Sequence, residues 1–227
     1  MISVIIPTLW KANEFFFPML DRMEDEPSIC EVIIINNDRQ NTPDFLSRFK
    51  KVKNVVMEKN VFFNLSMNIG VELSNPESDV ICLMSDDVVF ETEIFKFVSE
   101  KITNDIGMIM PNPDQFNMPR NISKHLTRDL TLRECLKIVD GCGCTMFVTK
   151  QNYSAIPKEL VHHFGDVWWY EYQIKNNRKN YFLDNWSIET PMRVTTRKCN
   201  DIVSPVIAND WRIVSDVFLK HGLRNPL

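Results

Sequence analysis

Short apolar runs alternate with helix-like segments through the first half of the chain, and each run stops at a cluster of polar residues. The three runs, each with its polar end, are 3–7 with Pro7 and Thr8, 31–36 with Asn36, Asn37 and Asp38, and 80–84 with Ser85, Asp86 and Asp87. Strand–helix alternation predicts an α/β fold, a mainly parallel sheet with helices on both faces. In such sheets ligands bind outside the carboxyl ends of the strands, so we expect the three polar clusters to form one site.

Further elements follow from periodicity and from start and stop signals. Strands are expected near 54–57, 106–110 and 180–186, a strand-like end near 139–148, and helices over 15–24, 63–74, 166–175 and from Thr92. Within 63–74, Leu65, Ile69 and Leu73 make an apolar stripe, with Asn64, Asn68 and Glu72 beside it as a polar one. Pro18 belongs near the start of its helix rather than its middle.

The second half is less regular. Residues 112–130 are polar and rich in Pro and Asn, which predicts a loop or flap. The sequence TLRE, from Thr131 to Glu134, is a capping box that opens a short helix. Asn209 is expected to cap a final helix that ends at Gly222.

Composition excludes several classes of protein. The 227 residues, 44% of them hydrophobic and 25% charged, suit one α/β domain with a sizeable core. A net charge of −4 argues against a protein that mainly grips nucleic-acid phosphates. No apolar stretch approaches the length of a membrane span, and the first residues are typical of a strand rather than a signal peptide. We expect a cytoplasmic protein.

The two carboxylates at the end of a core strand need an explanation. Asp86 and Asp87 would repel each other and lose hydration unless a positive group lies beside them. The candidates are a metal ion, a basic side chain, or simple exposure in which both acids cap the following turn. Their place at a strand's carboxyl end favours the metal.

The ordered series of motifs resembles the GT-A fold glycosyltransferases, especially the inverting family 2. The opening SVIIPT is similar to that family's first strand, and Asn60, Asn68 and Gly70 match three positions of its N-x-G-x-x-x-A-R-N-x-G pattern. LMSDDV falls where the family keeps a D-x-D motif, and HHFGDVWW where it keeps its catalytic carboxylate. The departures are Phe62 for a glycine, Met67 for an arginine, Ser85 and Gly165 for the first acids of two motifs, and a missing C-terminal histidine ligand.

The resemblance implies a nucleotide-sugar transferase with a single domain over 1–227. Its parts would be a nucleotide-sugar-binding half at 1–111, an acceptor-binding half at 112–205 and a C-terminal helix at 206–227. It implies a nucleoside-diphosphate-sugar donor, with UDP favoured over GDP or dTDP, a glycan or other hydroxyl acceptor, and an inverting displacement. Mn²⁺ or Mg²⁺ would bind the hard phosphate oxygens together with one or two carboxylates.

Each role has a structural alternative. Asp87 is the expected metal ligand and Asp166 the general base, although Asp166 also stands where a helix cap would be and His163 is a rival base. The donor would contact Pro7, Thr8, Asp38, Asn68, Ser85, Asp86 and Gly141. Against this, Asp38 is equally explained as an exposed turn residue, Asn68 as a tie between its helix and the strand ends, and Gly141 as a bulge.

The acceptor end is the least defined. His163, Trp168 and Trp169 are candidates, because an aromatic face matches the C–H face of a pyranose, but tryptophans in an aromatic helix are more often core residues. Glu189 is a remote substitute for the missing histidine ligand.

Two rival classes remain at this point. The first is a non-catalytic module that binds nucleotide sugars or carbohydrate. The second is a different nucleotide-using α/β transferase, although the first strand ends in Pro-Thr and not in a glycine-rich phosphate loop.

Overall fold

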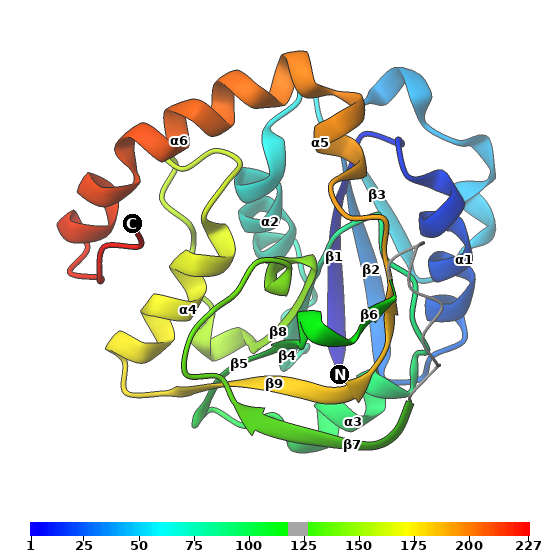
Figure 1. The fold of residues 1–227 in the computed structure, drawn as a ribbon. Helices are drawn as coiled ribbons and strands as arrows, with labels where there is room; N and C mark the ends of the chain where they lie inside the picture. The colour runs from blue at the N-terminus through cyan, green and yellow to red at the C-terminus, as the bar shows by residue number, and fades with distance from the viewer. Residues whose placement is uncertain (118–126) are drawn as a thin grey trace.

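One mixed, mostly parallel sheet organises the molecule, as the sequence predicts. Among residues 1–117 and 127–227, which the computed structural model describes, eight strands form this sheet in the order β3-β2-β1-β4-β8-β5-β9-β7 (Figure 1). Only β8 and β7 run antiparallel to the others. The strands are β1 Ile2–Thr8, β2 Ile29–Asn36, β3 Val52–Val56, β4 Val80–Met84, β5 Ile106–Pro111, β7 Thr127–Glu134, β8 Thr145–Thr149 and β9 Lys179–Trp186. A separate two-stranded sheet pairs β6 Phe116–Asn117 with β10 Ile188–Glu189.

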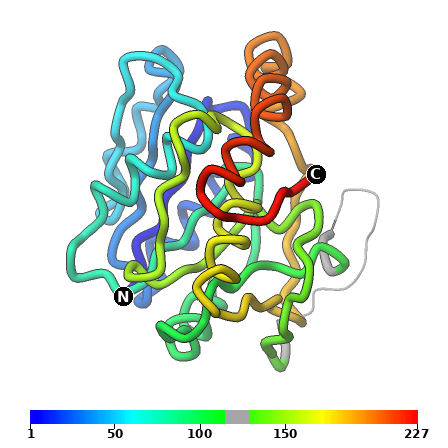
Figure 2. The backbone as a smooth tube through the Cα atoms, turned by 90° about the vertical axis from the view of Figure 1, so that its left-hand side faces the viewer, coloured from blue at the N-terminus to red at the C-terminus, as the bar shows by residue number. Residues whose placement is uncertain are grey.

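Helices cover both faces of the sheet. They are α1 Asn13–Glu24, α2 Phe62–Glu72, α3 Glu93–Lys101, α4 Gly165–Lys175, α5 Val194–Lys198 and α6 Asn200–Lys220. Alternate residues of β1 face opposite layers: Val4 and Ile6 pack in the cluster that contains α1 and α3, and Ile5 in the cluster that contains α2, α4 and α6. Figure 1 shows α5 and α6 across the end of the sheet where β1 stops, and Figure 2 shows α6 from the side.

The second half departs from expectation at the capping box. Residues Thr131 to Glu134 belong to β7, which pairs antiparallel with β9, and not to a helix. Leu132 lies opposite Leu183 in this pair of strands. The pairing stabilises the segment more than a short capped helix would, because an isolated helical turn is marginally stable. The loop expected at 112–130 therefore ends at Thr127, where β7 begins, and its part at 118–126 lies outside the described residues.

The last helix is longer than expected. It begins at Asn200, so Asn209 lies within it and caps nothing. Pro18 also lies inside its helix, six residues into α1. Within the described residues, no helix combines the length and the apolar character that a membrane crossing requires.

The stripes of α2 are inverted relative to the sequence pattern. Leu65 and Leu73 are exposed, whereas the buried side includes Asn64, Met67 and Gly70. Glycine lets the helix approach β1 closely, since a Cβ at Gly70 would lie 2.3 Å from Cγ2 of Ile5. Asn64 and Asn68 are therefore turned toward the segment that precedes α4, whereas Glu72 of the same stripe is exposed.

Candidate active site

A cavity of about 760 Å³ lies at the carboxyl ends of β1, β2 and β4. Most sequence-predicted site residues line it, together with residues from the segments before α2, α4 and α5. The lining residues expected from the sequence are Pro7, Thr8, Ser85, Asp86, Asp87, Gly141, His163 and Asp166. The polar clusters that follow β1 and β4 thus converge, as the rule for ligand sites in α/β sheets requires.

Asp86 is held between the ends of β1 and β4. The hydroxyl of Thr8 donates to Oδ2 of Asp86 at 2.6 Å, and the backbone N–H of Trp10 donates to Oγ1 of Thr8 at 2.8 Å. Burial raises the pKa of Asp86 to about 7, against the lowering effect of the Thr8 hydrogen bond. Near neutral pH this carboxyl therefore stands between its two protonation states.

Asp87 is also buried, but it faces a different element. The backbone N–H of Val194, at the start of α5, donates to Oδ2 of Asp87 at 3.2 Å. Burial raises the pKa of Asp87, while the charge of Arg197 lowers it. No salt bridge within the described residues pairs Asp87 with an arginine or lysine.

The oxygen atoms of Asp86 and Asp87 suit a hard divalent cation whose remaining ligands come from a bound phosphate. Two adjacent carboxyls with pKa values raised by burial form an oxygen-only set at the cavity wall, and a cation there would favour their ionised forms. The described residues hold no group of three or more His, Cys, Asp or Glu side chains that would make an all-protein metal site. A cation at Asp86 and Asp87 would therefore need further ligands from a bound substrate or from water.

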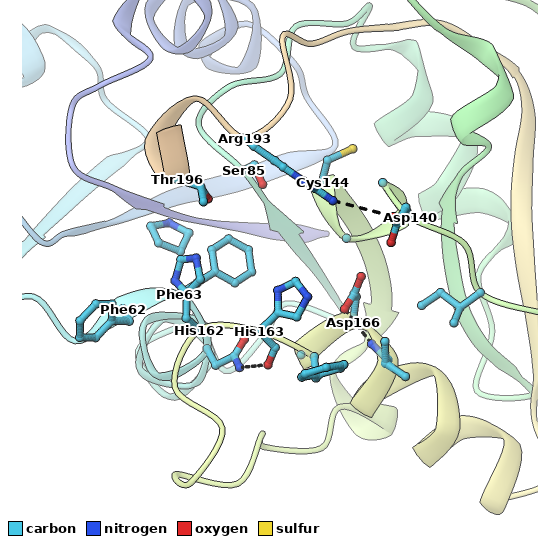
Figure 3. A pocket seen from close by; sticks show the side chains of 18 of the residues that line it. Phe62, Phe63, Ser85, Asp140, Cys144, His162, His163, Asp166, Arg193 and Thr196 are labelled. Carbon is cyan, nitrogen blue, oxygen red and sulfur yellow. Dashed lines mark hydrogen bonds and ion pairs between the residues drawn. The ribbon is translucent and has the colours of Figure 1, made fainter. Parts of the chain in front are cut away.

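Asp166 lies across the cavity from the strand ends, in the first turn of α4 (Figure 3). Burial raises its pKa, whereas the N–H of Val167 and the charge of His163 lower it. Oδ1 accepts from the backbone N–H of Val167 at 2.9 Å. Asp166 is not the cap of α4, because that position belongs to Phe164.

One glycine makes room for this carboxylate and another for Asn64. A Cβ at Gly143 would lie 2.8 Å from Oδ2 of Asp166, and one at Gly165 would lie 2.4 Å from Oδ1 of Asn64. Gly165 stands where the resembled family has an acid, and an acid there would clash with the buried side chain of Asn64.

The segment that precedes α4 is fixed from two sides. Asn64 of α2 donates through Nδ2 to the carbonyl oxygens of Leu160 at 3.0 Å and His163 at 2.8 Å. Asp210 of α6, which is fully buried, accepts from three consecutive backbone N–H groups, those of Val161, His162 and His163, at 3.1, 2.7 and 2.8 Å. These bonds set the position of the backbone that leads into Asp166.

An ion pair also belongs to the cavity lining, and its acid lies near Asp166. Arg193, which precedes α5, lies with Nη2 3.8 Å from Oδ2 of Asp140 (Figure 3). Both partners are largely exposed, so the pair itself contributes little stability. Arg193 and Met192 both have left-handed backbones, with φ of 58° and 54°, which is strained geometry for such side chains.

Four predicted residues do not line the cavity. Oδ2 of Asp38 accepts hydrogen bonds from Nζ of Lys11 at 3.4 Å and from Nδ2 of Asn41 at 2.7 Å, which matches the interpretation of Asp38 as a turn residue. Asn68 is engaged by Tyr153 and Ile156, so it ties α2 to the 153–156 segment. Trp168 and Trp169 are 3% and 2% exposed and belong to the core around α4.

Glu189 is likewise absent from the lining. It is exposed on β10, where its backbone pairs with that of Val89.

Several lining residues were not identified from the sequence. They include Phe62, Phe63, His162, Arg193 and Trp211, whereas Asn37 belongs to the expected polar cluster after β2. Phe62 carried a signal, because it stands where the resembled family has glycine, and its φ is 62°. Burial lowers the pKa of the neighbouring His162 to about 4, so its ring is neutral at pH 7. Trp211 had no usable signal, since its helix was expected to begin only two residues earlier.

Similarity to known proteins is structural. No protein-family model matches the chain, and no curated protein matches it by sequence. The structure of S. aureus TarS residues 1–349 with UDP is similar at a TM-score of 0.60 and 13% identity, over 83% of this chain and 60% of that chain. GalNAc-T7 with UDP, GalNAc and Mn²⁺ is similar at a TM-score of 0.58 and 10% identity, over 84% of this chain and 43% of that chain. This chain thus spans less than two thirds of either relative, and at these identities the likeness shows the fold alone.

Proposed function

We propose that this chain, which has the GT-A fold, is a metal-dependent glycosyltransferase that moves a sugar from a nucleoside-diphosphate sugar to an acceptor hydroxyl, with inversion. The observation that carries the proposal is that Asp86, Asp87 and Asp166 line one cavity at the carboxyl ends of the strands. UDP is favoured as the nucleotide, ahead of GDP and dTDP, because both TarS and GalNAc-T7 were solved with it.

The donor would lie against the ends of β1 and β4. Pro7, Thr8, Ser85 and Asp86 line that end of the cavity and would contact the nucleotide and its sugar. Asp87 would hold Mn²⁺ or Mg²⁺, with Asp86 beside it, and a cation bound there neutralises charge that develops on the departing diphosphate. The Mn²⁺ in the GalNAc-T7 structure supports this choice of ion.

Asp166 would act as the general base. Its carboxylate accepts the proton of the acceptor hydroxyl while that oxygen forms a bond to the anomeric carbon of the donor sugar. The bond from that carbon to the diphosphate oxygen breaks, and the nucleoside diphosphate leaves with the electron pair. A carboxyl whose pKa is raised by burial is a stronger base than an exposed aspartate, which suits this role.

The test combines binding with turnover. The melting temperature would be measured with UDP and GDP, each with and without Mn²⁺, and release of UDP from UDP-glucose, UDP-galactose and UDP-N-acetylglucosamine would be followed. We expect stabilisation by one nucleotide that requires Mn²⁺, and slow UDP release that Asp87→Ala abolishes.

The outcomes separate the rival classes. Mn²⁺-dependent nucleotide binding without UDP release, even when mono- and oligosaccharide acceptors are added, would indicate a binding module. Turnover of a nucleoside triphosphate in place of a diphosphate sugar would indicate a different transferase. Absence of any nucleotide-dependent shift would refute the proposed function.

A further inference from the structure

Trp211 differs from every other tryptophan of the chain. Trp10, Trp168, Trp169 and Trp186 are 5%, 3%, 2% and 0% exposed, whereas Trp211 is 49% exposed. It lies on α6 and lines the same cavity as Asp166. Single exposed apolar residues are common on protein surfaces, but Trp211 combines exposure with a place in the lining of the cavity, where a ligand could contact its ring.

The indole has a defined orientation. Its ring stacks on the ring of His163, with centroids 5.8 Å apart and planes inclined by 30°, and meets Phe164 edge-on at 4.8 Å. Phe164 is followed directly by Gly165 and Asp166, so the aromatic group abuts the start of α4, which carries the base. His162 turns the other way, toward Phe62 and Phe63.

The support beneath this aromatic group is rigid. Asp210, the residue before Trp211, binds the backbone N–H groups of Val161, His162 and His163. The helix that carries the indole and the segment that carries His163 are therefore locked together. A ring held in this way loses little conformational entropy when a ligand stacks on it.

We propose that Trp211, backed by His163, is a stacking platform for a pyranose ring of the acceptor, so that the acceptor is a carbohydrate. This inference rests on the proposed function. A pyranose has an apolar C–H face and a polar rim, and the cavity offers the same combination: an aromatic face with the polar side chains of His163, Asp166 and Glu171 in the same lining. The platform binds the acceptor and takes no part in proton transfer.

Fluorescence can test the platform without turnover. Because the other four indoles are buried, acrylamide quenching of tryptophan emission reports chiefly on Trp211. We expect methyl pyranosides of glucose, galactose or N-acetylglucosamine to protect this emission from acrylamide in the presence of UDP and Mn²⁺. Sorbitol, which has the hydroxyls but no ring face, should not protect, and Trp211→Phe should remove the quenchable signal altogether.

Kinetics supply the second measurement. Trp211→Ala should raise KM for the sugar acceptor about tenfold, while the affinity for UDP with Mn²⁺, measured by thermal shift, changes little. Trp211→Phe should retain part of the affinity. Ile202→Ala removes an exposed apolar side chain from the same helix outside the cavity lining and should change neither quantity.

The outcomes distinguish this inference from the proposed function. Protection by UDP alone would make Trp211 a nucleobase platform and overturn the acceptor role. Equal protection by sorbitol, or none by any pyranoside while UDP still binds with Mn²⁺, would overturn it as well. If pyranosides protect but no nucleotide binds, the platform stands and the transferase proposal fails.

Discussion

At the scale of single residues, the cavity concentrates carboxyl groups whose ionised forms are poorly solvated. Burial raises the pKa of Asp86, Asp87 and Asp166. The first two follow β4, whereas Asp166 lies in α4. Shifts of this kind are common among groups that bind cations or exchange protons, which supports the roles proposed for these three acids.

Asp166→Asn tests the base directly. The amide keeps the shape of the side chain and can still accept from the N–H of Val167, but it cannot take up a proton. We expect transfer to fall by about 10² to 10⁴-fold with donor affinity unchanged. Steady-state transfer and UDP binding would be measured on the same preparation, and transfer at the wild-type rate would exclude Asp166 as the base.

The pH profile should depend on His163. Activity requires ionised Asp166, so the acidic limb of kcat/KM should lie above the ordinary range of an aspartate, because burial raises this pKa. The charge of His163 lowers that pKa, so His163→Gln should move the limb to higher pH. A limb that stays in place would show that another group controls it.

Gly143→Ala probes the room left for the base. The added methyl would lie 2.8 Å from Oδ2 of Asp166 and must displace that side chain. We expect a loss of about tenfold or more in kcat, the scale on which a small misplacement of a catalytic group acts. Nucleotide-induced stabilisation, which depends on the strand ends, should remain and serves as the control for folding.

At the scale of elements, α6 determines where the base-bearing segment lies. Asp210→Ala leaves three backbone N–H groups without their carboxylate, and hydrogen bonds to charged groups are worth about 1.5–3 kcal/mol each. We expect the free energy of unfolding to fall by about 3 kcal/mol or more in urea titrations. Asp216→Asn removes an exposed acid from the same helix and should leave stability within about 0.5 kcal/mol of wild type.

The inverted stripes of α2 belong to the same scale. Periodicity found the helix but not its orientation, because its buried side is made of Asn64, Met67 and Gly70. The buried amide of Asn64 donates hydrogen bonds to backbone carbonyls of the segment before α4. A leucine at this position would leave those carbonyls without these hydrogen bonds. An element that positions a site can therefore turn its polar side to the interior.

At the scale of the whole molecule, stability should depend on pH and on ligands. The folded-state pKa of Asp86, about 7, exceeds its ordinary value, so the folded protein retains a proton that the unfolded chain releases. The contribution of Asp86 to the free energy of unfolding of the ligand-free protein should therefore fall as pH rises from about 4 through about 7, by at most about 4 kcal/mol, while the lowered pKa of His162 acts in the opposite direction.

Two comparisons check this expectation. Urea titrations at several pH values on the wild type and on Asp86→Asn give the contribution of Asp86 as a difference, because His162 is common to both. We expect the stability of the wild type relative to Asp86→Asn to fall over this interval, since the amide does not titrate. Mn²⁺ with UDP should restore stability mainly above neutral pH, where the carboxylates are ionised. A difference that rises over the same interval would contradict the pKa assigned to Asp86.

The α/β class, the first five strands and the convergence of Thr8, Ser85, Asp86 and Asp87 can be predicted from the amino-acid sequence, because strand periodicity is local and the carboxyl ends of parallel strands meet. Asp166 is found through its motif. Packing between distant segments, by contrast, makes TLRE a strand, keeps Asp38 and Asn68 out of the cavity lining, and leaves Trp211 exposed while Trp168 and Trp169 are buried. These outcomes depend on contacts between segments far apart in the chain, whose packing energies exceed the local propensities that a sequence displays.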